Sequence, residues 1–263
     1  MRFFRNKNYN DYIKARVFSK KHAIPNGLRV YAIGDIHGRC DLLDEIHGYI
    51  KADIDGSEPV EKNIIIYLGD YIDRGGDSRG VIESIITFSP IINGGELEKI
   101  YLKGNHEDAL INFLDNHEDA QPWLSYGGVN TLISYGMSSS MFQDQQLLHE
   151  KFMAVLPQDH LDFFTNQLRL CHTVGDFMFV HAGINPDNSL SEQTAADLMW
   201  IRHKFLNHRA MHAKIIVHGH NISKQVDFQK NRIGVDTGAY ATSILSCLVL
   251  EGVRARVINT RSS

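Results

Sequence analysis

Five short stretches of this sequence combine glycine with side chains that bind metal ions. They are GDIHG (34–38), GDYIDRG (69–75), GNHE (104–107), HAG (181–183) and HGH (218–220). Carboxylate, amide and imidazole groups together suit Mn²⁺ or Fe and are acceptable to Zn²⁺. The sequence therefore predicts a metal site whose ligands come from stretches far apart along the chain.

The number of candidate ligands indicates two metal ions. The candidates are Asp35, His37, Asp70, Asn105, His181 and one of the pair His218 and His220. Six ligands are too many for one catalytic ion that must keep an open position, but they suit two ions that share a carboxylate, and we expect Asp70 to bridge. Two ions roughly 3.5 to 4 Å apart lower the pKa of a shared water and stabilise both oxygens of a displacement at phosphorus.

Strand patterns precede each of these stretches and place them at one edge of a sheet. Runs of β-branched and aromatic residues occupy 28–33, 63–68, 99–102, 177–180 and 214–217. Open α/β sheets bind ligands beyond the carboxyl ends of their strands, so the five stretches are expected to converge. A lone strand-end aspartate is more often a helix cap than a ligand, but capping does not also predict His181 and His220.

Helical patterns alternate with the first strands, which is typical of an α/β domain. Apolar residues recur on one helical face at 42–50 and again at 81–86, where Asp77 and Ser78 are good N-cap residues. Further strands are predicted at 232–235, 243–250 and 254–258, and the last two form a hairpin at Glu251 and Gly252. An antiparallel hairpin makes a purely parallel sheet a poor description.

We divide the chain into a basic N-terminal arm (1–27) and a single domain (28–263) with a helical cap insertion (115–170). The insertion has amphipathic patterns around Leu124–Tyr135, Gln145–Leu156 and Pro157–Leu168. Five of its aromatic residues are assigned by helical spacing to its core more readily than to a ligand: Trp123, Tyr126, Tyr135, Phe142 and Phe152. Its position after the GNHE stretch leads us to expect it at the border of the site.

Composition narrows the class of protein. The 263 residues hold 27 Lys+Arg and 31 Asp+Glu, with 43% hydrophobic residues, which excludes disordered and fibrous chains. Residues 1–22 contain seven of the basic residues but one acidic residue, so the remainder has 20 basic and 30 acidic residues and would repel a nucleic acid backbone. Three cysteines at no disulfide-like or metal-like spacing, and no membrane-length apolar run or signal peptide pattern, favour a cytoplasmic protein without a membrane partner.

The ordered motifs GDIHG, GDYIDRG, GNHE, HAG and GH resemble those of the phosphoprotein phosphatases, a family of calcineurin-like metallophosphoesterases. The resemblance covers roughly residues 28–252 and is strongest to the compact bacterial members. Stretches that extend it are WLSYGG (123–128), DLMWIRHKFL (197–206) and VDTGAYAT (235–242). It implies an α/β metallophosphoesterase fold of two packed mixed β-sheets flanked by helices.

The resemblance also implies roles for individual residues. Asp35, His37 and Asp70 would bind one metal ion, and Asp70, Asn105, His181 and His220 the other. The family motif before the last ligand selects His220 over His218. His106 would be the general acid with Asp73 orienting it, and Arg74 and Arg202 would bind the phosphate. Arg202 depends on a looser match, and a surface helix arginine is the alternative.

The activity implied is that of a serine/threonine protein phosphatase with two divalent metal ions, Mn²⁺ first and Fe or Zn²⁺ as alternatives. The substrate would be a phosphorylated protein or a small phosphoester. One alternative is a symmetrical diadenosine tetraphosphate hydrolase, although that branch resembles GDIQG where this chain has His37. Others are a binding module on the same fold, which would lose ligands that this chain keeps, and a nuclease, which the acidic body of the chain disfavours.

Overall fold

Two mixed β-sheets form the centre of the structure, a computed structural model that describes residues 16–18, 22–92, 95–115, 120–138 and 144–260. The strands of the larger sheet are β1 (Arg16–Val17), β2 (Leu28–Ile33), β3 (Lys62–Tyr67), β4 (Glu96–Leu102), β5 (Leu168–Arg169), β11 (Ser246–Glu251) and β12 (Arg254–Asn259). Their order across the sheet is β1-β12-β11-β2-β3-β4-β5. The strands from β2 to β5 run parallel, whereas the β11–β12 hairpin is antiparallel to its neighbours.

The smaller sheet is mixed as well. Its strands are β6 (Cys171–Val174), β7 (Phe177–Val180), β8 (Ile215–His218), β9 (Asp227–Phe228) and β10 (Arg232–Gly234). Their order is β6-β7-β8-β10-β9, with three parallel strands in the middle and an antiparallel strand at each edge. The expected pair of mixed sheets is therefore confirmed.

Alternation of side chains along the strands produces the layers. Val30 and Ala32 of β2 share one buried cluster with Phe177 and Phe179 of β7, so this cluster fills the space between the sheets. The intervening Tyr31 faces the opposite side of the larger sheet. Because both faces of β2 are buried, its last four residues, Val30–Ile33, do not alternate with exposed polar residues.

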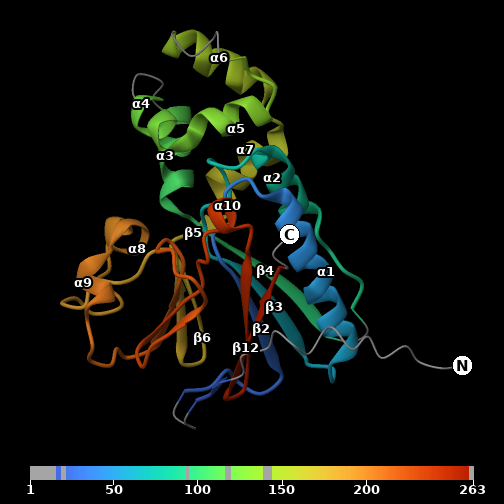
Figure 1. The fold of residues 1–263 in the computed structure, drawn as a ribbon, viewed down its shortest axis with the longest axis vertical. Helices are drawn as coiled ribbons and strands as arrows, with labels where there is room; N and C mark the ends of the chain where they lie inside the picture. The colour runs from blue at the N-terminus through green and yellow to red at the C-terminus, as the bar shows by residue number, and fades with distance from the viewer. Residues whose placement is uncertain (1–15, 19–21, 93–94, 116–119, 139–143, 261–263) are drawn as a thin grey trace, which may run out of the picture.

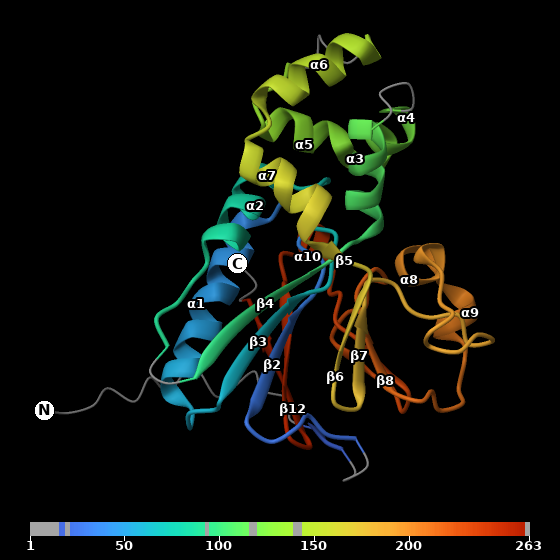
Figure 2. The same ribbon diagram turned by 180° about the vertical axis from the view of Figure 1, so that it is seen from behind.

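Helices cover the outer face of each sheet (Figure 1). Helices α1 (Cys40–Gly56) and α2 (Ser78–Thr87) flank the larger sheet, and the short helices α8 (Ala195–Trp200) and α9 (His203–Leu206) flank the smaller one (Figure 2). The expected N-cap of α2 is present, since the Asp77 side chain accepts a hydrogen bond from the Gly80 backbone N–H at 2.8 Å. This bond satisfies one of the free N–H groups at the helix start.

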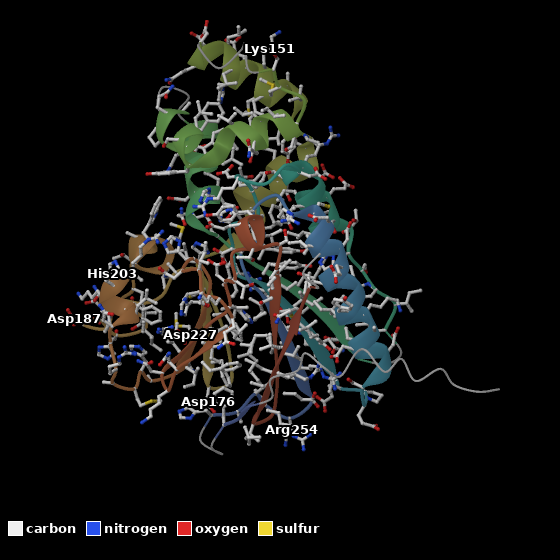
Figure 3. All side chains as sticks on the ribbon, in the orientation of Figure 1. Lys151, Asp176, Asp187, His203, Asp227 and Arg254 are labelled. Atoms are coloured by element: carbon white, nitrogen blue, oxygen red, sulfur yellow. The ribbon has the colours of Figure 1, made fainter. Side chains whose placement is uncertain are left out.

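The insertion forms a group of helices at one end of the molecule. Helix α3 (Asn105–Asp115) leads into it, and its elements are α4 (Ala120–Trp123), η2 (Leu124–Gly128), α5 (Val129–Ser134), α6 (Gln145–Val155), α7 (Gln158–Asp162) and η4 (Phe163–Gln167). Figure 3 shows Lys151 on α6 at this end and Arg254 at the opposite end. Trp123 and Phe152 belong to the cluster that also packs α1 and α2 on the larger sheet, so the insertion extends that core.

Some predicted boundaries were wrong for identifiable reasons. The strand expected at 243–250 begins at Ser246, because Ser243 has a left-handed backbone (φ 56°) that ends α10 (Ala239–Thr242). The prediction also missed β6, a half-buried edge strand with only one fully buried residue. Most of the basic arm lies outside the described residues, as does Phe142. The arm contributes strand β1 (Arg16–Val17), which pairs with β12.

No helix in the described part of the chain is both long and apolar enough to cross a membrane. The three cysteines are all free; Cys40 and Cys171 are half-buried, and Cys247 is buried.

Candidate active site at the strand ends

The predicted ligands converge where the strands of both sheets end. Asp35 and His37 follow β2, Asp70 follows β3, and Asn105 begins α3 directly after β4. From the smaller sheet, His181 follows β7 and His220 follows β8. All six side chains belong to residues that are at most 8% exposed.

Asp70 lies at the centre of the group. Its Oδ2 is 3.5 Å from His37 Nε2, and its Oδ1 is 3.4 Å from His181 Nε2. The same His181 nitrogen is 3.1 Å from Asn105 Oδ1 and 3.2 Å from His220 Nδ1. One carboxylate thus faces ligand groups from two sheets, which is the arrangement a bridging ligand needs.

Two sets of candidate ligand atoms meet at Asp70. The atoms of His37, Asp70 and His106 lie within 4.8 Å of one another, as do those of Asp70, His181 and His220. Asp35 is in neither set, and both of its carboxylate oxygens accept from the backbone N–H of His220, at 3.1 and 2.9 Å. The structure therefore places Asp35 beside the ligand sets.

Hydrogen bonds to the backbone determine which ring nitrogens face the centre. His37 Nδ1 is 2.9 Å from the Ile72 carbonyl oxygen, and His181 Nδ1 is 2.8 Å from that of Leu68. A carbonyl oxygen only accepts, so in each case Nδ1–H donates and Nε2 faces Asp70. Fixing the tautomer in this way is usual for histidines that bind metal.

The pKa shifts at the centre differ from one group to the next. Burial opposes protonation of His181, yet Asp70 and Asp35 raise its pKa to about 10. Burial lowers the pKa of His37 to about 3, so this ring stays neutral. Burial and Asp70 help to raise the pKa of another carboxyl, Asp236, to about 6. A buried group of acids with convergent lone pairs fits divalent cations.

Backbone strain concentrates at the same place. Six described residues other than glycine have positive φ, and five of them are His37, Asp70, Asp73, Arg74 and His220. Each such residue costs on the order of 1–3 kcal/mol and persists only where the surroundings hold it. The strain therefore marks a site that the surrounding structure maintains.

Two motif glycines are required by close contacts at this centre. Gly69 has φ +98°, and a Cβ there would lie 2.7 Å from Gly104 N and 2.9 Å from His181 Nδ1. A Cβ at Gly104 would lie 2.2 Å from Asp70 Oδ1. Both glycines permit the approach of ligand-bearing loops, which explains their position beside Asp70 and Asn105.

Glu107 is a buried residue to which the sequence analysis gave no role. Its carboxylate accepts from the backbone N–H groups of Asp70 and Tyr71, both at 2.8 Å, and of Gly104, at 3.0 Å. It thereby ties the loop after β3 to the loop after β4. Its place in the GNHE stretch is the one sequence signal that marked it.

His106 and Asp73 form a buried pair next to the ligand sets. His106 Nδ1 is 2.6 Å from Asp73 Oδ2, and His106 Nε2 is 3.9 Å from Asp70 Oδ2. Burial opposes protonation of His106, but Asp70 and Asp73 together raise its pKa. Arg74 Nη2 is 3.1 Å from His106 Nε2, so a cationic donor and an imidazole share one corner of the site.

Trp123 and Thr131 contact Asp73 from the insertion, which the sequence did not reveal. Trp123 Nε1 donates to both carboxylate oxygens of Asp73, at 3.2 and 3.1 Å, and Thr131 Oγ1 donates to Oδ1 at 2.6 Å. Trp123 is one of the insertion's aromatic residues, but its separation of 50 residues from Asp73 gives no spacing signal.

Half-exposed aromatic residues form a rim beside the site. Tyr126, Trp200 and Tyr240 are 43%, 39% and 37% exposed. The Tyr126 ring lies 6.2 Å from that of His106 and 6.0 Å from that of Trp200, and Arg74 Cζ lies 4.8 Å from the Tyr240 ring centre. Aromatic side chains at this rim are able to stack on a planar group.

The remaining predicted residues occupy different places. Arg202 is exposed before α9, and its charge is among the causes that lower the pKa of His220, after burial and His181. His218 lies outside both ligand sets, with Nε2 3.4 Å from Arg232 Nη1 and Nδ1 3.0 Å from the Gly219 carbonyl oxygen.

Comparison with known proteins gives one family. The family model "Calcineurin-like phosphoesterase" matches residues 28–243. Bis(5'-nucleosyl)-tetraphosphatase PrpE [asymmetrical] of Anoxybacillus flavithermus is 24% identical over 237 residues, which cover 82% of this chain and 88% of that protein. The protein of the same name from Bacillus thuringiensis is 24% identical over 240 residues, with the same coverage of both chains.

Solved structures are similar in fold. A putative diadenosine tetraphosphatase has a TM-score of 0.56 at 16% identity, covering 89% of this chain and 95% of its own. A cold-active protein-tyrosine phosphatase of Shewanella has a TM-score of 0.57 at 17% identity, and the match covers 92% of this chain and 84% of that one. A protein serine/threonine phosphatase of Saccharomyces cerevisiae has a TM-score of 0.51 at 14% identity, and the match covers 90% of this chain and 81% of that one.

Proposed function

The chain belongs to the calcineurin-like phosphoesterase family, and we propose that it is a metal-dependent phosphomonoester hydrolase of the serine/threonine protein phosphatase type. The observation that carries the proposal is the buried pair His106 and Asp73, 2.6 Å apart, beside the ligand sets around Asp70. A proton donor next to a cation site is what cleavage of an alkyl phosphate requires.

Two divalent ions would be held by the chain's own carboxylates, amide and imidazoles. We assign Asp35, His37 and Asp70 to one ion and Asp70, Asn105, His181 and His220 to the other. Bound there, the ions would lower the pKa of a water and neutralise charge on the phosphoryl oxygens. Oxygen and nitrogen ligands favour Mn²⁺, with Fe or Zn²⁺ as alternatives. Asp35 would turn from the His220 backbone N–H to act as a ligand.

Arg74 Nη2 donates to His106 Nε2 in this structure; once Arg74 turns to the phosphate, His106 would protonate the leaving oxygen through Nε2, which also faces Asp70. Asp73 binds the opposite nitrogen, which fixes the ring orientation and stabilises its charged form. Arg74 and Arg202 would bind phosphoryl oxygens, because a guanidinium presents paired donors that match them.

The leaving group connects this geometry with a phosphorylated alcohol. The alkoxide of serine or threonine is a strong base and needs a proton as the P–O bond breaks. The leaving oxygen of a phosphoanhydride is a weak base, since a phosphate monoester has a second pKa of about 6, and it gains little from an acid. A well-held proton donor therefore favours phosphoserine and phosphothreonine, with tolerance for phosphotyrosine and p-nitrophenyl phosphate.

A dinucleoside tetraphosphate is a second candidate substrate. It is favoured by the names of the curated relatives and by the aromatic rim at Tyr126 and Trp200, since an aromatic side chain can stack on a base. The argument from His37 applies to enzymes that cleave this substrate symmetrically, whereas the named relatives are asymmetrical.

One comparison of substrates distinguishes the two candidates. The Mn²⁺-loaded enzyme is assayed with phosphoserine and phosphothreonine peptides, phosphotyrosine peptides and diadenosine tetraphosphate. We expect the highest kcat/KM for a phosphoserine or phosphothreonine peptide. A tenfold preference for diadenosine tetraphosphate, about 1.4 kcal/mol of transition-state stabilisation, would assign the site to nucleotides instead.

A further inference from the structure

We propose that Trp123 and Thr131 are positioning residues of the active site, through which the helical insertion holds Asp73 in line with His106. The proposal rests on the proposed function in one respect, the role of His106 as proton donor. It gives the insertion a part in the reaction beyond that of forming a border.

The contacts at the Asp73 carboxylate come mainly from the insertion. Three side chains donate to it: His106 Nδ1, Trp123 Nε1 and Thr131 Oγ1. Asp73 is fully buried, so no bulk water can replace a lost donor. Two of the three donors that orient this carboxylate thus belong to the insertion.

The Thr131 hydroxyl both donates and accepts hydrogen bonds in this arrangement. Its hydroxyl donates to Asp73 Oδ1 at 2.6 Å and accepts from the Asp73 backbone N–H at 2.9 Å. Ser78 Oγ, which lies 3.0 Å from Thr131 Oγ1, is 3.1 Å from the same backbone nitrogen. One hydroxyl therefore fixes both the side chain and the backbone of Asp73.

The insertion also holds the backbone of the next residue, Arg74. Its N–H donates to the Gly127 carbonyl oxygen at 3.4 Å, and its carbonyl oxygen accepts from Asn130 Nδ2. The approach is so close that a Cβ at Gly127, which has φ +111°, would lie 2.9 Å from Arg74 N. Asp73 and Arg74 are thus both hydrogen-bonded to the segment 123–131.

These contacts hold an unfavourable backbone conformation in place. Asp73 and Arg74 are consecutive residues with left-handed backbones, φ 72° and 66°. Side chains other than glycine rarely adopt this conformation, and neighbouring contacts must maintain it. Loss of the insertion's contacts should let Asp73 turn away from His106 while the ligands of the ion site stay in place.

The test compares Thr131→Val and Trp123→Phe with His106→Asn, using two substrates that differ in leaving group. Thr131→Val keeps the shape and removes the hydroxyl; Trp123→Phe keeps a ring and removes the N–H. We expect kcat on phenyl phosphate to fall about 10- to 100-fold in Thr131→Val, with a much smaller loss on p-nitrophenyl phosphate and unchanged KM and metal content. Trp123→Phe should show the same substrate dependence, and Thr131→Ser should restore activity.

Thr165→Val is the matched control, because Thr165 lies in the same insertion and its exposed hydroxyl donates to the Leu161 carbonyl oxygen. It should leave both rates unchanged. If His106→Asn loses more activity on phenyl phosphate but Thr131→Val loses equally on both substrates or not at all, the positioning role is wrong. If His106→Asn itself loses equally on both, the proton-donor role fails and the positioning role fails with it.

Discussion

Asp70 is the residue whose side chain contacts both ligand sets. Asp70→Asn removes the charge that both would share, and one amide oxygen cannot replace two carboxylate oxygens. We expect this variant to lose both ions, measured as metal per chain by elemental analysis. Asp35→Asn should lose mainly one. Two ions retained in Asp70→Asn would remove the shared-carboxylate arrangement.

His220 and His218 provide a matched pair two residues apart. His220 Nδ1 is 3.2 Å from His181 Nε2, whereas His218 faces Arg232. His220→Ala should therefore reduce bound metal, and His218→Ala should leave it near the wild-type level. Equilibrium dialysis against Mn²⁺ measures both, and the reverse result would mean that the ligand is His218.

Arg202 tests the phosphate-binding assignment. Arg202→Ala should weaken transition-state stabilisation by about 1.5–3 kcal/mol, the usual contribution of a hydrogen bond to a charged group. The ratio of kcat/KM between wild type and variant measures this loss. The exposed Arg209 in the same region is the control, and Arg209→Ala should have no effect. An Arg202→Ala enzyme as active as the wild type would identify Arg202 as a surface residue.

Sequence motifs predicted which polar residues gather at the strand ends, because the ends of parallel strands must share an edge. They could not predict where individual side chains point. Asp35 accepts from the His220 backbone, and Thr131 reaches Asp73 across 58 positions. Both contacts depend on packing between elements, which leaves no local spacing in the sequence.

At the scale of elements, α1 contains a buried histidine that should make folding sensitive to acid. His47 stacks on Phe88 with ring centres 3.8 Å apart, and its Nε2 is 2.8 Å from the Tyr67 hydroxyl. Burial, and to a lesser degree Lys99, lowers its pKa to about 3. Below its ordinary pKa the unfolded chain binds a proton that the folded chain does not, so stability falls as pH falls from about 6.5 toward 3.

His47→Gln should remove this part of the pH dependence. Between pH 7 and pH 5 the wild type should lose about 2 kcal/mol more unfolding free energy than the variant, as measured by urea denaturation. The other buried histidines are the same in both proteins, so their contributions to the pH dependence of stability cancel in the comparison. The exposed His203 is the control, since His203→Gln should keep the wild-type slope. Parallel stability curves for wild type and His47→Gln would contradict the burial argument.

Long buried strands could be read from the sequence, whereas short edge strands could not. The strand predicted at 28–33 is observed as Leu28–Ile33, because five of its six residues are buried. The two-residue strands β1, β5 and β9 have no periodic pattern to detect. They form only because a longer neighbouring strand offers free hydrogen-bonding groups.

For the molecule as a whole, the proposed active site draws on three parts: the two sheets and the insertion. The larger sheet supplies Asp35, His37, Asp70 and Asn105, and the smaller sheet supplies His181 and His220. The insertion holds Asp73 through Trp123 and Thr131. Separation of the two sheets and the insertion should therefore abolish activity before secondary structure is lost.

Metal reconstitution tests the central claim most directly. Enzyme stripped with a chelator is titrated with Mn²⁺ while bound metal and turnover of a phosphoserine peptide are followed together. The account predicts no activity in the stripped enzyme and full activity as occupancy approaches two ions per chain. Full activity at one ion or fewer per chain, or in the presence of the chelator, would contradict it.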